Sequence, residues 1–260
     1  MPIFNNDLIN SLIKITPESN LTTVREERLS ATENTQLAFT TIFSTPSVLL
    51  TQDVKYEFAH LVAQQTGSLV LAHFYKALIK ESSNDLNTAA LLAAKNYLQV
   101  LVHSPKKTHY ELIQSLTEQG WNEADIILLA QLITFVTYQA RLVEGLLLLQ
   151  GVDTQPPSSL TAPITAGHWN INAQTHQGLP APTAFTQDQL GWASWLKARE
   201  QQTLSSDEAL VMKKFGQLNS EYFLLLAHQS KILEIRTLID RGIFIPPVDY
   251  RAGNVNLLPL

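Results

Sequence analysis

Three residues in the first third of the chain have the types and spacing needed for proton transfer. His73 follows Gly67 on an apolar segment. Glu57 and His60 lie three residues apart in the segment before it, so on a helix they share one face. A tight turn at 66–67 would fold that face back against His73. A carboxylate that orients an imidazole makes an acid–base pair, and we therefore take these three residues as candidate catalytic residues.

Each candidate also has a plain structural interpretation. The apolar residues around His73 recur with helical spacing, which favours a core or interface histidine that is satisfied by one hydrogen bond. Glu57 is more typical of a solvated helix charge. This interpretation predicts a largely buried His73, whose truncation lowers stability by about 1–3 kcal/mol and matters more for stability than for any activity.

Two further groups of residues could hold a ligand. Arg141 and Glu144 lie one helical turn apart, which indicates a structural ion pair or, as the alternative, an arginine that faces an anionic ligand. His168 and His176 flank a loop-like stretch, but a zinc site needs a third protein ligand close by. We therefore expect a ligand-binding role for Arg141 at most, with no metal and no cofactor.

The composition excludes several kinds of chemistry. The chain has no cysteine, which rules out disulfides, thiolate metal sites and cysteine nucleophiles and makes the reducing cytoplasm the expected location. The net charge is −5 without a basic cluster, so we expect no nucleic-acid binding. The first residues lack the pattern of a signal peptide. Polar residues interrupt the apolar segment 126–149, which predicts a buried helix and no membrane contact.

The pattern along the chain predicts an all-α protein in three parts. Residues 1–151 read as consecutive helices, one of them capped by Thr51 and ending at Gln65. Residues 152–190 hold five prolines and no helical period, which is typical of a linker or an arm. Helical signals return in 191–260, and Trp192 and Trp195 are the expected anchors for docking these helices.

The longest predicted helix, capped by Asn122 and closed by Gly151, carries two apolar stripes. One stripe can pack inside its own bundle, and we expect the other to need a second cover. Only 16% of the residues are charged, which is low for a monomer in solution. Together these features predict a homo-oligomer, a dimer or larger.

The stretch "LTEQGWNEADIILLAQLITFVTYQARLVEG" resembles the helix pair that follows the active site in the alkylhydroperoxidase-D-like and carboxymuconolactone decarboxylase superfamily. It is most similar to the peroxidase-related branch, and the resemblance covers roughly residues 30–150. It implies an alkylhydroperoxidase-D-like helical bundle related to antioxidant peroxidases.

The peroxidases of that superfamily carry a glutamate followed by Cys-x-x-Cys-x-x-x-His. Placing that histidine on His73 puts Thr66 and Leu69 where the two cysteines belong, and leaves Glu57 about one turn nearer than the family's glutamate. A threonine hydroxyl does not ionise enough near pH 7 to attack a peroxide, so we expect no thiol peroxidase activity. The decarboxylase branch uses acid–base chemistry instead, which His73 and Glu57 could supply with an arginine to hold a carboxylate.

Residues 185–244 resemble the opening of a companion peroxidase-related protein, and the sequence stops before that protein's cysteine motif. The resemblance therefore implies a superfamily domain at 1–151 joined to the start of a second unit. From this we expect a catalytically silent, oligomeric protein that binds a ligand or a partner, such as the companion protein. The alternative is a cysteine-free decarboxylase-like or isomerase-like enzyme that uses His73 and Glu57.

Overall fold

A computed structural model describes residues 7–80, 88–152 and 194–244, together with 173–174, 180–181 and 183. Its central element is α8 (Glu123–Leu149), the long apolar helix that the sequence predicts. The Asn122 side chain caps its first turn by accepting a hydrogen bond from the Asp125 backbone N–H. Gly151, with a φ of 78°, allows the Val152 N–H to reach back to the Leu147 carbonyl and end the helix.

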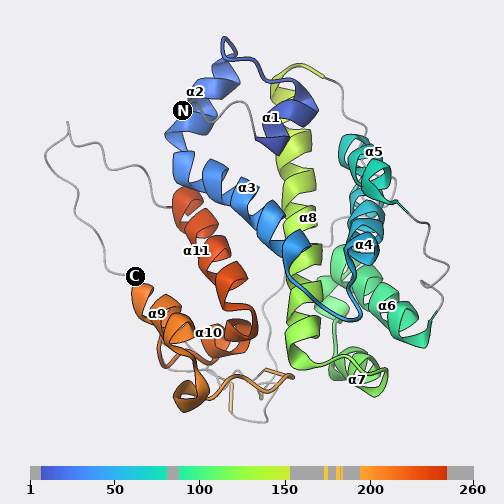
Figure 1. The fold of residues 1–260 in the computed structure, drawn as a ribbon, viewed down its shortest axis with the longest axis vertical. Coiled ribbons are helices and arrows are strands. Elements are labelled where there is room, and N and C mark those ends of the chain that lie inside the picture. The colour runs from blue at the N-terminus through green and yellow to red at the C-terminus, as the bar shows by residue number, and fades with distance from the viewer. Residues whose placement is uncertain are drawn as a thin grey trace, which may run out of the picture.

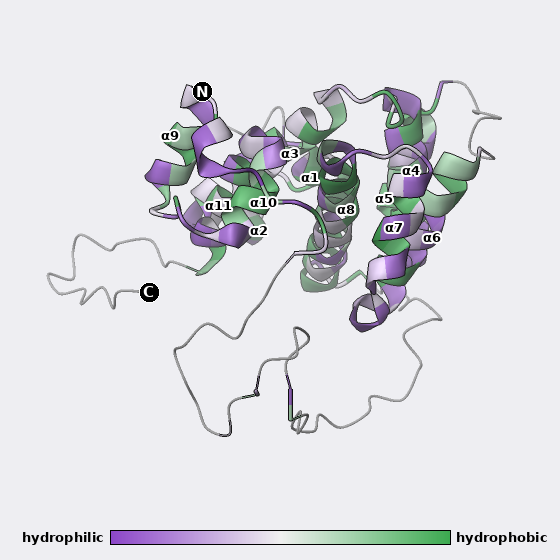
Figure 2. Ribbon diagram, turned by 90° about the horizontal axis from the view of Figure 1, so that it is seen from below, coloured by the Kyte–Doolittle hydropathy of each residue, from purple (hydrophilic) through white to green (hydrophobic). Residues whose placement is uncertain are grey.

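Two groups of helices enclose α8 from opposite sides (Figures 1 and 2). One side is built by α2, α3 and the C-terminal helices, and the other by the helices from α4 to α7. The helices before α8 are α1 (Leu8–Ile13), α2 (Asn20–Glu27), α3 (Leu29–Ser44), α4 (Gln52–Gln65), α5 (Leu69–Leu78), α6 (Ala89–His103) and α7 (Tyr110–Glu118). The all-α prediction is therefore confirmed, because the described residues contain no strand beyond one isolated bridge at 174 and 180.

The described C-terminal helices pack on the first half of the same chain. They are α9 (Ser206–Lys214), α10 (Glu221–Leu226) and α11 (Ser230–Phe244). Helix α11 lies along α3 (Figure 1), and Ile232, Ile235 and Ile239 join the main core. A smaller core joins α8 to this end of the chain through Ile127, Met212, Leu226, Ala227 and Leu233. Residues 194–244 are thus integral to the fold that residues 7–152 begin.

Trp195 does not anchor this segment to the first half of its own chain, because its side chain is 48% exposed. Trp192 lies outside the described residues. The isoleucines of α11 join the core instead, because they recur at helical spacing on a helix that packs along α3.

The expected need for a second subunit over α8 is also wrong along most of the helix. Leu128, Leu132 and Phe135 of the second stripe are buried by this chain's own helices, as is the first stripe. Helix α8 is long and apolar enough to cross a membrane, but 61% of its most apolar window is buried inside the described structure. Such burial is what the core helix of a bundle shows, in line with the predicted buried helix.

The closest approach of α11 to α3 is made possible by Gly242. A Cβ added there would lie 2.5 Å from the Ala31 backbone nitrogen, whereas a Cβ at Gly145 of α8 meets nothing within 4 Å. We predict that Gly242→Ala lowers the free energy of unfolding by about 1–3 kcal/mol, because the two helices must separate.

Gly145→Ala is the matched control for this prediction. It should raise the free energy of unfolding by about 0.5–1 kcal/mol, since alanine is the better helix former and no neighbour has to move. Urea unfolding followed by circular dichroism measures both variants. Equal effects of the two substitutions would show that the α3–α11 contact does not limit stability.

Candidate functional site

The α4–α5 hairpin carries the residues that the sequence singles out for acid–base chemistry. Gly67, with a φ of 79°, makes the turn, and the Thr66 hydroxyl donates back to the Val62 carbonyl at 2.8 Å. The fold of the hairpin is therefore as predicted. His60 Nδ1 lies 2.8 Å from the Ala72 carbonyl oxygen, which joins the two helices directly.

The hairpin gives the candidate catalytic residues different environments. His73 is exposed, so the predicted core histidine is wrong, while Glu57 is buried rather than a solvated charge. The reason lies in the register of α5, which turns Leu71, Ala72 and Tyr75 inward and leaves position 73 on the outer side.

A buried hydrogen bond holds α5 against α8. The Tyr75 hydroxyl donates to Gln139 Oε1, and both side chains are enclosed. Burial raises the pKa of Tyr75 well above its ordinary value, so the hydroxyl keeps its proton at any physiological pH. Tyr75 therefore serves as a structural donor in this position.

The other candidates from the sequence do not assemble into a site. Arg141 is exposed, and no ion pair joins it to Glu144, so the predicted structural pair is wrong. His168 and His176 lie outside the described residues. Among the residues that the structure describes, no group of three or more histidines and carboxylates could hold a metal ion.

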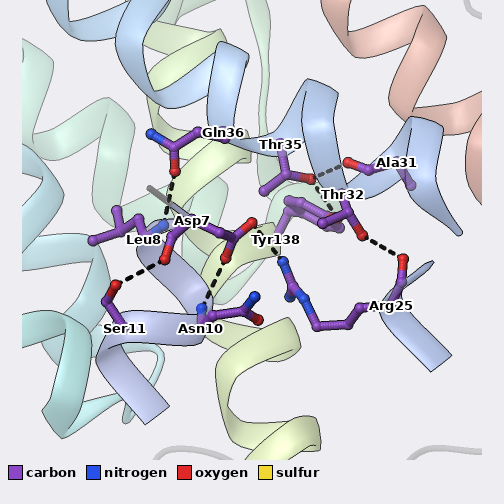
Figure 3. Close-up of polar contacts among 10 residues, drawn as sticks. All are labelled: Asp7, Leu8, Asn10, Ser11, Arg25, Ala31, Thr32, Thr35, Gln36 and Tyr138. Carbon is purple, nitrogen blue, oxygen red and sulfur yellow. Dashed lines mark hydrogen bonds and ion pairs between the residues drawn. The ribbon is translucent and has the colours of Figure 1, made fainter. Parts of the chain in front are cut away.

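A buried polar cluster joins α1, α2, α3 and α8 (Figure 3). The Arg25 guanidinium donates to Asp7 Oδ2 at 2.8 Å, and both side chains are almost fully buried. Asp7 Oδ1 also accepts from the Asn10 N–H at 2.8 Å and so caps α1. This carboxylate already has two structural partners, and the Asp7–Arg25 ion pair joins the start of α1 to α2.

The same cluster reaches α8 through hydroxyl groups. Thr35 lies 3.0 Å from the Tyr138 hydroxyl and donates to the Ala31 carbonyl at 2.7 Å, and Thr32 donates to the Arg25 carbonyl at 2.9 Å. Sequence reasoning missed this cluster, because Arg25 lies in a polar helix where an arginine usually faces water. Only the helix cap at Asp7 is visible in the sequence.

Sequence reasoning also missed Lys55 of α4, whose side chain is buried although lysines almost always face water. The side chain is 2% exposed, and its Nζ donates to the Phe43 carbonyl at 3.4 Å and to the Thr45 carbonyl. Burial lowers the pKa of Lys55 from 10.5 to about 8, while the nearby Asp125 carboxylate acts in the opposite direction. Its partners are backbone carbonyls at the end of α3.

A surface groove of about 350 Å³ lies where the end of α11 meets the corner between α2 and α3. It is lined by Glu26, Glu27, Arg28, Leu29, Ser30, Arg241 and Gly242. The Arg241 guanidinium also lies over the Phe215 ring, 4.8 Å from its centroid. Two segments about 200 residues apart build this groove, so no local pattern in the sequence could indicate it.

No family model, no curated protein and no solved structure matches this chain. The superfamily resemblance of residues 30–150 therefore stays a prediction.

The two hairpin histidines differ in a way that stability measurements can detect. We predict that His60→Ala lowers the free energy of unfolding by about 1 kcal/mol, because the ring loses its bond to the Ala72 carbonyl. His73→Ala should change it by no more than about 0.5 kcal/mol, because position 73 faces solvent.

Thermal unfolding of the two variants beside the parent protein makes the comparison. A loss of stability on His73→Ala that equals or exceeds the loss on His60→Ala would restore the core interpretation of His73.

Proposed function

We propose that this chain is a cysteine-free helical binding protein whose ligand site is the groove between α11 and the α2–α3 corner. The observation that carries the proposal is the groove itself. Its volume of about 350 Å³ lies at the lower end of the range for small-molecule sites, and it is formed by chain segments that the packing of α11 on α3 holds in place.

The lining of the groove indicates the class of ligand. Leu29 supplies exposed aliphatic surface, and Ile243 and Phe244 at the end of α11 are exposed beside it. The charged residues of the lining are Glu26, Glu27, Arg28 and Arg241. A small molecule with an aliphatic part and one charged end would match such a surface, because it covers the leucine and keeps its charge at the rim.

The acid–base alternative has less support. Its support is the hairpin turn, which packs α5 against α4 as an active site would require. Against it stands the difference in burial between an exposed His73 and a buried Glu57. We also propose membership of the alkylhydroperoxidase-D-like superfamily, on the support of the all-α fold with an α4–α5 hairpin followed by a long core helix.

Two simple probes test the groove. We predict that leucine amide and N-acetyl-leucine, added in turn to the ¹⁵N-labelled full chain, shift the amide resonances of residues 26–30 and 241–242 in a saturable way. A shallow site of this size should bind at least one of them with a Kd on the order of 1 mM, equivalent to about −4 kcal/mol. The sign of the preferred charge would follow from the comparison.

A matched pair of variants separates the groove from general surface binding. Ser30→Trp fills the groove, and Thr40→Trp puts the same ring on an exposed position of the same helix. Binding should disappear in the first variant and persist in the second. Shifts that do not saturate, or that survive Ser30→Trp, would rule out the groove as the ligand site.

We further propose a homo-oligomer and a cytoplasmic location, the latter on the support of the missing cysteines alone. The support for the oligomer now comes from the C-terminal end of α8 and no longer from its two apolar stripes. Leu148 and Leu149 in the last turn of α8 and Val152 just beyond it are large apolar side chains that stay exposed. A second copy that covered these three side chains would remove them from water.

Light scattering on the full chain tests self-association. We expect a mass of at least twice 29.0 kDa for the parent chain, and 29.0 kDa for the double variant Leu148→Gln with Leu149→Gln. Leu37→Gln with Leu92→Gln removes two other exposed leucines and should leave the mass unchanged. A parent chain of 29.0 kDa at high concentration would show that this surface is not an interface.

A further inference from the structure

The buried ion pair between Asp7 and Arg25 leaves part of the guanidinium group unused. An arginine and a carboxylate often pair through two parallel N–H···O bonds. Here Asp7 Oδ1 accepts from the Asn10 backbone N–H and caps α1, and the Arg25 guanidinium bonds to Oδ2 at 2.8 Å. The Arg25 Nε–H is enclosed, and no residue that the structure describes accepts a hydrogen bond from it.

A second enclosed polar atom, Asn10 Oδ1, likewise has no hydrogen-bond partner among the described residues. The Asn10 and Arg25 residues are only 4% and 6% exposed. Both bond to Asp7, one to each carboxylate oxygen, which brings them together between α1 and α2. The Asn10 side chain points toward the Arg25 guanidinium (Figure 3). The cluster thus encloses one unused donor and one unused acceptor on either side of the same carboxylate.

We propose that an internal water molecule binds between Arg25 Nε and Asn10 Oδ1. Water accepts a hydrogen bond from the first atom and donates one to the second, and buried waters commonly satisfy enclosed polar groups in this way. An anion would accept from Arg25 but could not donate to Asn10. A metal cation would bind Asn10 Oδ1, but the guanidinium charge would repel it.

The ligand of this site is therefore neutral, and it both donates and accepts. It must also fit among side chains that are more than nine-tenths buried, and water is the smallest molecule that meets these conditions. With the water in place, the guanidinium joins α2 to the start of α1 at two points, directly through Asp7 and through the water to Asn10. The site is separate from the ligand groove, since none of these three residues lines it.

NMR contacts between protein protons and water test the site in the ¹³C,¹⁵N-labelled full chain. Arginine Nε–H groups resonate apart from the backbone amides, so that of Arg25 can be observed by itself. We expect it to show a cross-peak to water with opposite signs in the NOE and ROE spectra, which distinguishes a bound water from proton exchange. The Nε–H of Arg141, an exposed residue, should show no such contact. An Arg25 signal without this contact would overturn the proposal.

The Asn10→Leu variant separates a bridging water from a neighbouring hydroxyl group. Leucine fills a similar volume but offers no acceptor, so the water loses one of its two partners and the cross-peak should disappear. The Thr32 and Thr35 hydroxyls of the same cluster stay in place in this variant. A contact that is relayed through one of them would persist, and its persistence would rule out the bridging water. Asn219→Leu, at an exposed asparagine between α9 and α10, is the matched control and should preserve the cross-peak.

A crystal structure of the parent chain keeps the proposal testable if the Asn10→Leu variant fails to fold. One peak of electron density should lie about 2.7–3.2 Å from both Arg25 Nε and Asn10 Oδ1. If these two atoms bond to each other directly, or if no density lies between them, the water site does not exist.

Discussion

Every other feature of this protein depends on the burial of α8. A helix of 27 residues that is apolar over most of its circumference must be covered on nearly all sides. No single neighbour can do so, because two packed helices touch along one stripe only. The chain solves this by placing helices from its beginning and its end on one side, and those from its middle on the other (Figure 1). Helix α11 therefore contributes side chains to the same core as the helices of residues 7–152.

Burial on this scale brings polar groups into the interior, and several of them form hydrogen bonds between helices there. The Asp7–Arg25 pair, the Thr35–Tyr138 contact and the Tyr75–Gln139 bond lie between helices and join them at defined positions. An apolar stripe alone would allow α8 to slide or rotate against its neighbours. A buried hydrogen bond does not allow this, because any displacement leaves a polar atom without a partner.

Local signals in the sequence predict the bounds of helices and turns well, but they predict poorly which residues become buried. Asn122, Thr51 and Gly67 act locally, so the bounds of α8 and α4 and the hairpin turn could be read from the sequence. His73 lies on a helix with apolar residues around much of its circumference, and periodicity cannot decide which side a tertiary contact will cover.

The groove and the Lys55 site are beyond prediction for a different reason. The groove is built by two segments about 200 residues apart, and the Lys55 site by a side chain of α4 and a backbone carbonyl of α3. Both exist only once these parts meet in the folded chain. Arg141 shows the reverse error, since its spacing from Glu144 permits an ion pair that the two side chains do not form. Spacing along a helix indicates which side chains can make contact, and tertiary packing determines which of them do.

The antiparallel contact between α3 and α11 also determines the order in which the protein can be completed during synthesis. Helix α3 leaves the ribosome long before its partner, since about 190 residues separate Ser44 from Ser230. At 5–20 residues per second this interval lasts roughly 10–40 seconds. Throughout that time the face of α3 around Ala31 lacks the contact with α11 that Gly242 permits in the folded chain. The α3 side of the core can therefore be completed only after residues 230–244 have been made.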